Sequence, residues 1–248
     1  MAQVFKEKIR RFFETIFGSA TKDFKQIPII INNYNRVSTL KKLISDLEKR
    51  GYYNIHIIDN KSTYPPLLDY YKVCPYRVYR LKKNIGFKAL WRSGLWYRFF
   101  QGYYCYTDSD LSLVEDCPDD FLKTFYNLLK KYPKVHKVGF SLKIDDLPNT
   151  YHFKKEVIDW ESKFYQNPKE KNVFIAPIDT TFALYRPFSK RGKRDGSMEM
   201  LRTGWPYQCH HLPWYVNSAK LSAEEEYYIK SLEAPTHWGA KDQNSEEK

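Results

Sequence analysis

The chain has 248 residues, of which 42% are hydrophobic, enough to build one α/β domain or two closely packed halves. Its formal net charge of +12 makes nucleotide phosphates, anionic lipid or nucleic acid the expected neighbours, without choosing among them. The four cysteines include no CxxC pair, which argues against a zinc knuckle or a disulfide scaffold and favours a cytoplasmic compartment. No apolar run approaches the roughly 20 residues that a transmembrane helix needs.

Residues 1–24 predict an amphipathic, basic helix. Its apolar side chains recur at helical spacing: Phe5, Ile9, Phe12, Phe13 and Ile16. Lysines and arginines flank this stripe, and Gly18 ends it. The pattern is typical of a helix on an anionic membrane surface, and also of a helix packed on its own domain or on a second subunit. We favour the membrane surface, approached from one side.

From residue 27 onward, strand patterns alternate with helix patterns. Buried strands are expected at 27–31, 54–58, 77–81 and 103–107. A helical stripe of leucines and isoleucine follows the first strand and ends at Gly51, and a helix over 87–100 follows the third. Such alternation predicts an α/β fold with a mostly parallel, doubly wound central sheet flanked by helices.

The fourth strand runs into the sequence YTDSDL, which places two aspartates beside each other. Asp108 and Asp110 emerge together at the carboxyl end of that strand, where parallel sheets place their ligands. Two carboxylates held this close repel each other unless a cation lies between them, and oxygen ligands next to phosphates suit Mg²⁺ or Mn²⁺. We therefore predict a metal bound to a diphosphate at this point of the sheet.

Polar residues also follow the other strands. Asn33 and Arg36 follow the first, Asp59 ends the second, and Asn84 and Lys88 follow the third. The turn NNYNR has no glycine, so it is not the glycine-rich turn of a Rossmann fold, and the chain has no P-loop. A nucleotide would therefore be recognised by side chains and a metal.

Beyond the aspartates, the patterns predict a helix at 118–132, a strand at 135–144, a helix at 151–164 and a strand-like run at 175–187. Residues 189–204 are basic and predict a mobile loop, which would either close over a charged donor or simply be solvated. Residues 205–215 are aromatic and predict a structured wall of the site, and 240–248 predict a disordered tail.

Several motifs together resemble those of GT-A glycosyltransferases, close to family 2. They are IPIIINNYNR, HIIDNKST, LKKNIGFKALW and YTDSDL, with DSD in the place of the DXD motif. The runs PDDFLKTFYNLLKKYP, VGFSLKIDDLP, APIDTTFALYRP and HLPWY resemble a bacterial polysaccharide-type branch. The resemblance implies a nucleotide-binding half at 27–113 and an acceptor-binding half at 114–239. Asn60 departs from the family pattern, which often has a second acidic residue there, and no plain ED pair precedes a helix.

The resemblance also implies roles for individual residues. The nucleotide and donor sugar would be bound by Asn33, Arg36, Asp59, Asn84, Lys88, Asp108, Ser109 and Arg202. Within this set Asp59 would face the base ring, and Arg202 of the basic loop would compensate the charge of the leaving diphosphate.

For the metal, the resemblance implies Asp108 and Asp110 as ligands of Mn²⁺ or Mg²⁺. His211 is the predicted third ligand, because in several GT-A families a histidine near the end of the domain completes the metal site. An imidazole ligand favours Mn²⁺ over Mg²⁺. The alternative for His211 is stacking against an acceptor sugar, with His237 as the reserve ligand. His210 should point elsewhere, because adjacent residues of an extended chain face opposite sides.

Sugar transfer also requires a base that removes the proton of the acceptor hydroxyl. The candidates, in order, are Asp179, Asp146 and Glu199. In GT-A enzymes the strand-like run that holds Asp179 lines the acceptor side of the donor sugar. For each candidate the alternative is a carboxylate that binds an acceptor hydroxyl or caps a helix.

The sequence thus predicts a metal-dependent hexosyltransferase that moves a sugar, with inversion, from a nucleotide-diphosphate donor to a glycan or glycolipid acceptor. UDP is the expected nucleotide, polysaccharide biosynthesis the expected pathway, and the cytoplasm, peripherally on the inner face of the membrane, the expected place. One alternative is a sugar nucleotidyltransferase of related fold, which would need an early glycine-rich loop and an activating lysine. The other is a basic nucleic-acid-binding protein, which leaves the DSD strand unexplained.

Overall fold

The computed structural model of the chain describes residue 12, residues 23–189 and residues 199–232. The predicted amino-terminal helix therefore lies outside the described residues, apart from the exposed Phe12. The middle of the predicted basic loop, His237 and the predicted disordered tail lie outside them too. No helix in the described part of the chain is long and apolar enough to cross a membrane.

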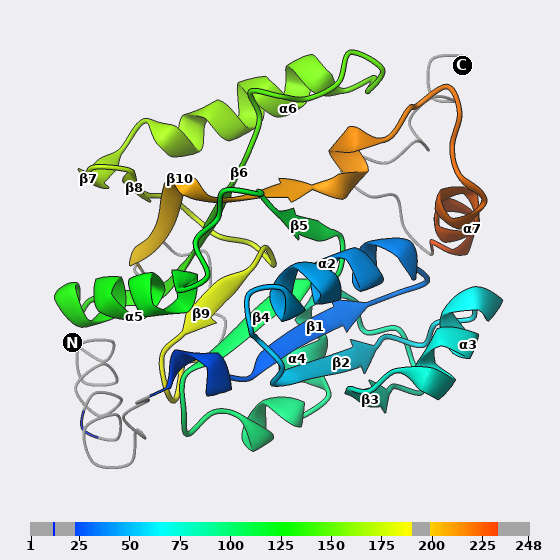
Figure 1. Ribbon diagram of the computed structural model, residues 1–248, viewed down its shortest axis with the longest axis horizontal. Coiled ribbons are helices and arrows are strands. Elements are labelled where there is room, and N and C mark those ends of the chain that lie inside the picture. The colour runs from blue at the N-terminus through cyan, green and yellow to red at the C-terminus, as the bar shows by residue number, and fades with distance from the viewer. Residues whose placement is uncertain (1–11, 13–22, 190–198, 233–248) are drawn as a thin grey trace.

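The described strands form one ten-stranded sheet in the order β3-β2-β1-β4-β9-β6-β10-β8-β7, with β5 beside β10 (Figure 1). Its parallel part consists of β1 (Ile29–Asn33), β2 (Ile55–Asp59), β3 (Arg77–Arg80) and β4 (Tyr104–Asp108). This part confirms the predicted strand–helix alternation. The rest is mixed: β9 (Ala183–Tyr185) runs antiparallel between β4 and β6 (Val135–Leu142), and β10 (Glu199–His211) runs parallel to β6.

Shorter strands complete the far edge of the sheet: β5 (Leu111–Leu113), β7 (Pro168–Glu170) and β8 (Val173–Ile175). The α-helices are α2 (Ser38–Glu48), α3 (Pro65–Val73), α4 (Ala89–Arg92), α5 (Phe121–Lys131), α6 (Lys154–Glu161) and α7 (Ala223–Ser231). The 3₁₀ turns are η1 (Phe24–Gln26), η2 (Gly86–Lys88), η3 (Leu95–Arg98), η4 (Ser162–Tyr165) and η5 (Leu212–Tyr215).

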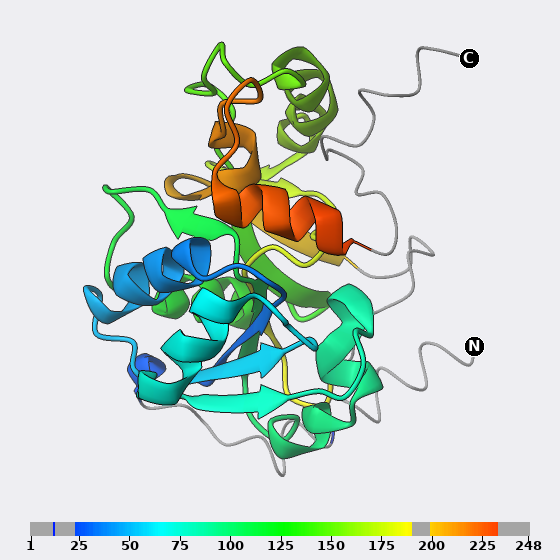
Figure 2. The ribbon, with the colours of Figure 1, turned by 90° about the vertical axis from the view of Figure 1, so that its right-hand side faces the viewer.

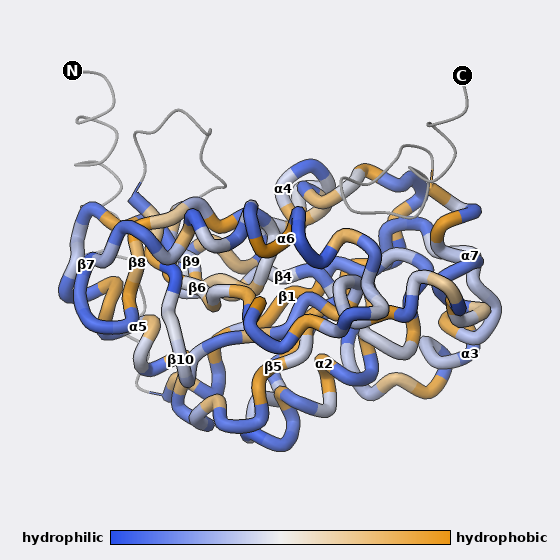
Figure 3. The backbone as a smooth tube through the Cα atoms, turned by 90° about the horizontal axis from the view of Figure 1, so that it is seen from above, coloured by the Kyte–Doolittle hydropathy of each residue, from blue (hydrophilic) through white to orange (hydrophobic). Residues whose placement is uncertain are grey.

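The first strand supplies core side chains to both faces of the sheet. Ile29 and Ile31 belong to the hydrophobic cluster that includes the leucines of α2 and the phenylalanines of α5, whereas Ile30 belongs to the cluster that includes Leu90 of α4. Successive side chains of a strand point to opposite faces, so a strand covered by helices on both sides is apolar throughout. The hydrophobic stretch of β1 accordingly lies in the interior in Figure 3.

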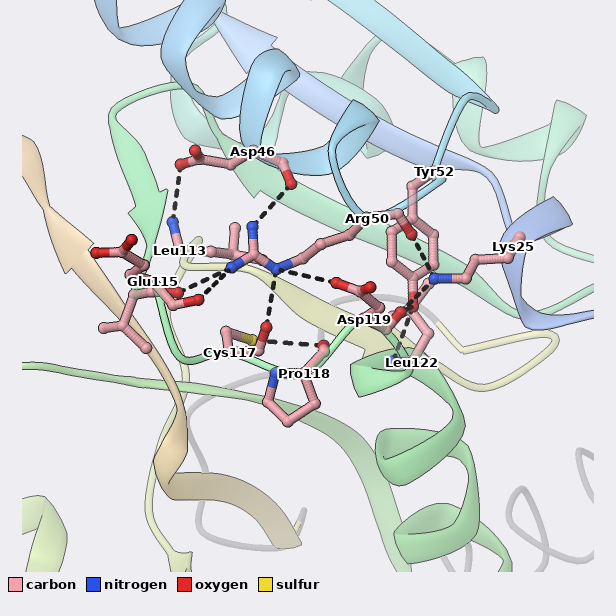
Figure 4. Close-up of polar contacts among 11 residues, drawn as sticks. Lys25, Asp46, Arg50, Tyr52, Leu113, Glu115, Cys117, Pro118, Asp119 and Leu122 are labelled. Atoms are coloured by element: carbon pink, nitrogen blue, oxygen red, sulfur yellow. Dashed lines mark hydrogen bonds and ion pairs between the residues drawn. The ribbon is translucent and has the colours of Figure 1, made fainter.

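A polar network fastens the segment after the DSD motif to the carboxyl end of α2 (Figure 4). Arg50 donates to the carbonyl oxygens of Val114, Glu115 and Cys117 at 2.9–3.0 Å. Asp46, although 3% exposed, accepts from the Leu113 amide at 3.2 Å and is paired with Lys42. Because an unpaired carboxylate in such a place would be costly, these bonds fix α2 and the segment after the DSD motif as one unit.

Two predicted elements differ in the structure. The helix expected over 87–100 is broken into η2, α4 and η3, because Gly94 has φ of 80° and ends α4 in a left-handed conformation. The loop expected over 189–204 is wrong from residue 199 onward, since β10 begins at Glu199. Pairing with β6 and β8 forms this strand despite its weak apolar pattern.

Two helices were missed by sequence reasoning. α3 begins with prolines in its first turn, a recognisable start signal, and α7 begins after the capping residue Ser222, whose hydroxyl accepts from the Glu225 amide at 3.2 Å. Within the strand-like run 175–187, Ile175 ends β8 and residues 183–185 form β9, whereas Pro177 to Thr180 cross the carboxyl end of β4 as an irregular segment. That segment carries Asp179.

Candidate functional site

The candidate site lies at the carboxyl ends of three neighbouring parallel strands. β1 pairs with β2 on one side and β4 on the other, so the order of strands along the sheet reverses at β1. In open α/β sheets, ligands bind outside the carboxyl ends at such a switch point. Asn33 pairs with Asp59 and Asn32 pairs with Asp108 in the strand register. The polar ends of the three strands therefore lie side by side.

Asn33 is buried and ties the first strand to the DSD motif. Its Oδ1 accepts from the Ser109 hydroxyl at 2.6 Å, and its Nδ2 donates to the Tyr71 hydroxyl oxygen at 2.9 Å. Both ends of the amide are thus satisfied within the protein. The structure brings Asn33 and Ser109 to the site, where they hold the aspartates in place.

Asp59 is fully buried at the end of β2. One carboxylate oxygen accepts from the Ser62 amide at 3.1 Å, and the other lies 3.3 Å from Arg80 Nε. Beside these groups a pocket of about 650 Å³ opens between α3 and β3, and Tyr71 and Arg80 are among its lining residues. The Asp59 carboxylate is covered and does not line this pocket, whereas its neighbours Tyr71 and Arg80 do.

The loop that carries Asn84 and Lys88 is held against the end of β2 by Asn60. Asn60 accepts from the Ile85 amide at 2.8 Å and donates to the Gly86 carbonyl at 3.1 Å. Asn84 accepts from the Gly86 amide at 3.0 Å, which turns the chain into η2, where the half-buried Lys88 lies. An aspartate at position 60 could accept from Ile85 but not donate to Gly86, so an asparagine fits both contacts.

Asp108 is held at the end of β4 by neutral hydrogen-bond donors. Its carboxylate accepts from Asn32 Nδ2 at 3.2 Å and from the Thr180 hydroxyl. Burial raises the pKa of Asp108 to about 8, and the nearby carboxylate of Asp110 adds to the rise, although the two hydrogen bonds oppose it. Asp108 therefore binds a proton well above the pH at which an exposed aspartate would lose it.

Asp110 is bound by an arginine from the turn after β1. Nη1 of Arg36 lies 2.8 Å from Oδ2 of Asp110, and Nη2 lies 2.7 Å from Oε1 of Glu225 on α7. Arg36 is 4% exposed, and its guanidinium lies over the Tyr228 ring at 3.8 Å. A single buried cation thus balances two carboxylates, one from the DSD motif and one from the last described helix.

His211 ends β10 beside the same aspartate, with its Nε2 atom 3.7 Å from Oδ2 of Asp110. Its Nδ1 is buried without a hydrogen-bond partner among the described residues. Burial lowers the pKa of His211 and the nearby Arg36 adds to this, although Asp110 opposes it. The structure thus brings the predicted third ligand to Asp110.

These residues do not form a metal site as they are arranged. Among the described residues, no group of three or more His, Cys, Asp or Glu side chains could hold a metal ion. Arg36 already bonds the Asp110 carboxylate, and the Asp108 carboxylate already accepts from Asn32 and Thr180. An ion at Oδ2 of Asp110 would have to displace Arg36.

Asp179 lies next to the DSD motif, as its predicted role requires. The Asp108 amide donates to the carbonyl of Thr180 at 2.9 Å, and the Asp179 carboxylate contributes to the raised pKa of Asp108. The Asp179 side chain is exposed. A carboxylate at this place can reach a group that approaches Asp108 from solvent.

The other base candidates lie elsewhere. Asp146 accepts from the Tyr215 hydroxyl at 2.5 Å and lies 3.2 Å from His210 Nε2, on the side of β10 opposite His211. Its hydrogen bonds lower the pKa of Asp146, although burial acts in the other direction. Glu199 begins β10, at the opposite end of the strand from His211, and is paired with Lys169 at 2.8 Å.

Arg202 also has a partner away from the aspartates. Its Nη1 lies 2.7 Å from Oε2 of Glu161, and its Nε donates to the Pro177 carbonyl at 2.8 Å. Both side chains are buried, and the guanidinium lies 4.3 Å from the centre of the Phe164 ring. The predicted contact of Arg202 with a diphosphate is therefore replaced by a buried ion pair that braces the segment before Asp179.

Five residues of the site were missed by sequence reasoning: Asn32, Tyr71, Thr180, Glu225 and Tyr228. Asn32 was detectable, because it is the first of two polar residues at the end of an otherwise apolar strand. Glu225 and Tyr228 were not, because only the folding of α7 back onto the turn after β1 brings them to Arg36.

Comparisons with known proteins identify no family for the chain. No family model matches it, and no curated protein matches it. One similar solved structure is GalNAc-T7 with UDP, GalNAc and Mn²⁺, which is 14% identical, with 85% of this chain and 48% of that chain covered and a TM-score of 0.49. This chain thus spans about half the length of that protein.

Two further structures show weaker likeness. Glucosyl-3-phosphoglycerate synthase from Mycobacterium tuberculosis, in complex with phosphoglyceric acid, is 12% identical over 73% of this chain and 61% of that chain, with a TM-score of 0.41. A cytidylyltransferase from Leptospira borgpetersenii is 10% identical over 57% of this chain and 72% of that chain, with a TM-score of 0.34. Likeness at these levels assigns neither a family nor an activity.

Proposed function

We propose that the chain is a glycosyltransferase of the GT-A type, which transfers a sugar from a nucleoside-diphosphate donor to the hydroxyl group of a glycan or glycolipid acceptor. The observation that carries the proposal is the convergence of Asn33, Asp108 and Asp110, with Arg36, at the switch point between β1 and β4. The motif resemblance and the net charge of +12 support an anionic donor. UDP is the proposed nucleotide.

The donor would lie across the carboxyl ends of β2, β1 and β4. Its base would enter the pocket beside Tyr71 and Arg80, and Arg36 would face the diphosphate, since a guanidinium can bind two phosphate oxygens at once. The donor sugar would then reach Asp108, whose protonated carboxyl can donate a hydrogen bond to a sugar hydroxyl. This order places the reacting carbon near Asp179.

The chemical step is proposed as a single displacement with inversion. Asp179 accepts the proton of the acceptor hydroxyl while that oxygen bonds to the anomeric carbon. The bond between this carbon and the phosphate oxygen breaks, and the diphosphate leaves with the electron pair. Arg36 offsets the negative charge that develops on the leaving group. The exposed position of Asp179 beside Asp108 leaves room for an acceptor to approach.

No step is assigned to a metal, because Arg36 holds Asp110 in the described arrangement. The metal part of the sequence prediction is checked by measuring nucleotide binding in Mn²⁺ and in EDTA. Binding that requires Mn²⁺ would support a metal as part of the donor site. On the same resemblance we propose that the enzyme acts at the inner face of a membrane, in polysaccharide assembly. Transfer of the sugar to lipid-linked acceptors checks this.

The decisive experiment combines ligand binding with turnover. Thermal stability is measured with a panel of nucleotides and nucleotide sugars; a ligand at 100 times its dissociation constant stabilises by about 2.7 kcal/mol. We expect UDP and one UDP-sugar to stabilise the protein. Asp179→Asn should keep this shift and lose transfer by about 10²-fold or more. Asp145→Asn, at an exposed aspartate paired with Lys143, is the matched control and should keep both. If no nucleotide shifts the transition, the proposal is wrong.

A further inference from the structure

Helix α7 lies across the turns that leave β1 and β2, which form one wall of the candidate site (Figure 2). The Tyr227 hydroxyl lies 3.1 Å from the hydroxyl of Thr63, after β2. Ser231 accepts from Asn35 Nδ2 at 2.8 Å, after β1. The helix therefore covers the edge of the sheet at which a donor would have to enter.

Two glutamates in the first turn of α7 bind hydrogen-bond donors that could otherwise bind an anion. Glu224 accepts from the amides of Val37 and Ser38 at 3.0 Å, at the amino end of α2, and also from the Ser38 hydroxyl. Glu225 lies 2.7 Å from Nη2 of Arg36. Helix amino ends and guanidinium groups are also what proteins use to bind phosphate. The two carboxylates thus lie on donors that a diphosphate would need.

The helix is poorly suited to hold this position by itself. It has nine residues, and none of them is buried. Isolated helices of this length are marginal in water, so α7 depends on its contacts with the turns. Two of these contacts are made by carboxylates, Glu224 and Glu225, and a competing anion can take their place and so weaken the hold on α7.

From these observations we infer that α7 is a strap that closes the donor site, with Glu224 and Glu225 standing where the donor's diphosphate binds. This inference rests on the proposed function. When a donor enters, its phosphates replace Glu225 on Arg36 and Glu224 at the amino end of α2, and α7 leaves the edge of the sheet. Donor affinity is then reduced by the fraction of molecules in which the strap is closed.

The test measures the affinity of the full chain for UDP and for pyrophosphate by calorimetry. The double variant Glu224→Gln with Glu225→Gln weakens the contacts that hold α7. We expect it to bind both probes about tenfold more tightly. This is the change that results when the open form rises from roughly a tenth of the molecules to most of them. Glu226→Gln is the matched control, because Glu226 faces Lys230 at 3.4 Å on the exposed side of the same turn. It should bind as the unaltered chain does.

A second variant separates release of the strap from a simple gain of positive charge. Tyr227→Ala removes an uncharged contact on Thr63 and Tyr64, and it should also tighten binding, by a smaller factor. In the unaltered chain, backbone amides of residues 223–231 should exchange hydrogen faster when pyrophosphate is saturating. This readout needs no variant to fold.

The outcomes divide cleanly. If pyrophosphate binds more tightly to the variants but UDP binds no more tightly than pyrophosphate, the strap is supported and the proposed nucleotide function is wrong. If UDP binds equally to every variant, the function stands and the strap is overturned. The strap is also overturned if neither probe binds any variant, or if ligand slows exchange in α7, since the helix would then close over a ligand instead of competing with it.

Discussion

The ammonium group of Lys137 lies 3.1 Å from the backbone carbonyl oxygen of Asp179. The same group donates to the Ile178 carbonyl at 2.7 Å and to the Tyr185 hydroxyl at 3.0 Å, and Lys137 is 2% exposed. A buried ammonium with three acceptors has its donors satisfied. It therefore fixes the irregular segment that carries Asp179 against β6 and β9.

The first prediction is that Lys137→Met reduces kcat by about tenfold or more with little change in donor affinity. Losing the ammonium removes its contacts with the carbonyls of Ile178 and Asp179 and lets Asp179 shift, and misplacement of a reacting group by about 1 Å costs up to 10²-fold. Lys143→Met, which removes a partly exposed lysine paired with Asp145, is the control. Steady-state kinetics check the result, and an unchanged kcat in Lys137→Met would contradict the role given to this lysine.

The second prediction concerns stability and pH, through Asp108. Its pKa in the folded protein is about 8, above the value of about 3.9 in an unfolded chain. Between these two pKa values the folded state keeps a proton that the unfolded state has lost. The contribution of Asp108 to the free energy of unfolding is therefore largest below pH 4 and falls as the pH rises to 8. Urea unfolding at pH 5 and pH 8, in EDTA, should show a smaller loss for Asp108→Asn than for the unaltered chain. Equal losses would refute the raised pKa.

The third prediction concerns the buried pair of Arg202 and Glu161. Glu161→Gln should destabilise the fold by about 3–5 kcal/mol, because it leaves a buried guanidinium without a counter-charge. The double variant Glu161→Met with Arg202→Met removes both charges and should recover most of this loss. Urea unfolding measures the free energy for all three proteins. A double variant as unstable as Glu161→Gln would show that the bond from Arg202 to Pro177 matters more than the charges.

The fourth prediction concerns Gly139, where β6 lies closest to β9. A Cβ atom at this position would lie 2.4 Å from the backbone oxygen of Phe182, so Gly139→Ala must push the two strands apart. We expect a destabilisation of about 1–3 kcal/mol or more. Gly204→Ala is the milder comparison, because its new Cβ would meet the side chain of Phe174 at 3.1 Å, which can shift. Thermal unfolding of both variants should rank them in this order.

The sequence by itself determined the parallel half of the sheet. The first three residues of β1 are apolar on both faces of the strand, and the stripe of α2 places Leu40, Leu43 and Leu47 on one face. Periodicity of this kind depends only on neighbours along the chain. The same local information placed Asp108 and Asp110 just beyond a buried strand, and hence at the edge of the sheet where the site lies.

The tertiary structure alone decided what those aspartates contact. Arg36 and Asp110 are separated by 74 residues in the chain, and Arg36 and Glu225 by 189, so no local pattern pairs them. The partner of Arg202 was equally hidden, because a charge in a basic, glycine-containing segment indicates a solvated loop until pairing with β6 and β8 buries it. Strand and helix follow from periodicity, but the partner of a buried charge follows from which segments the whole fold brings together.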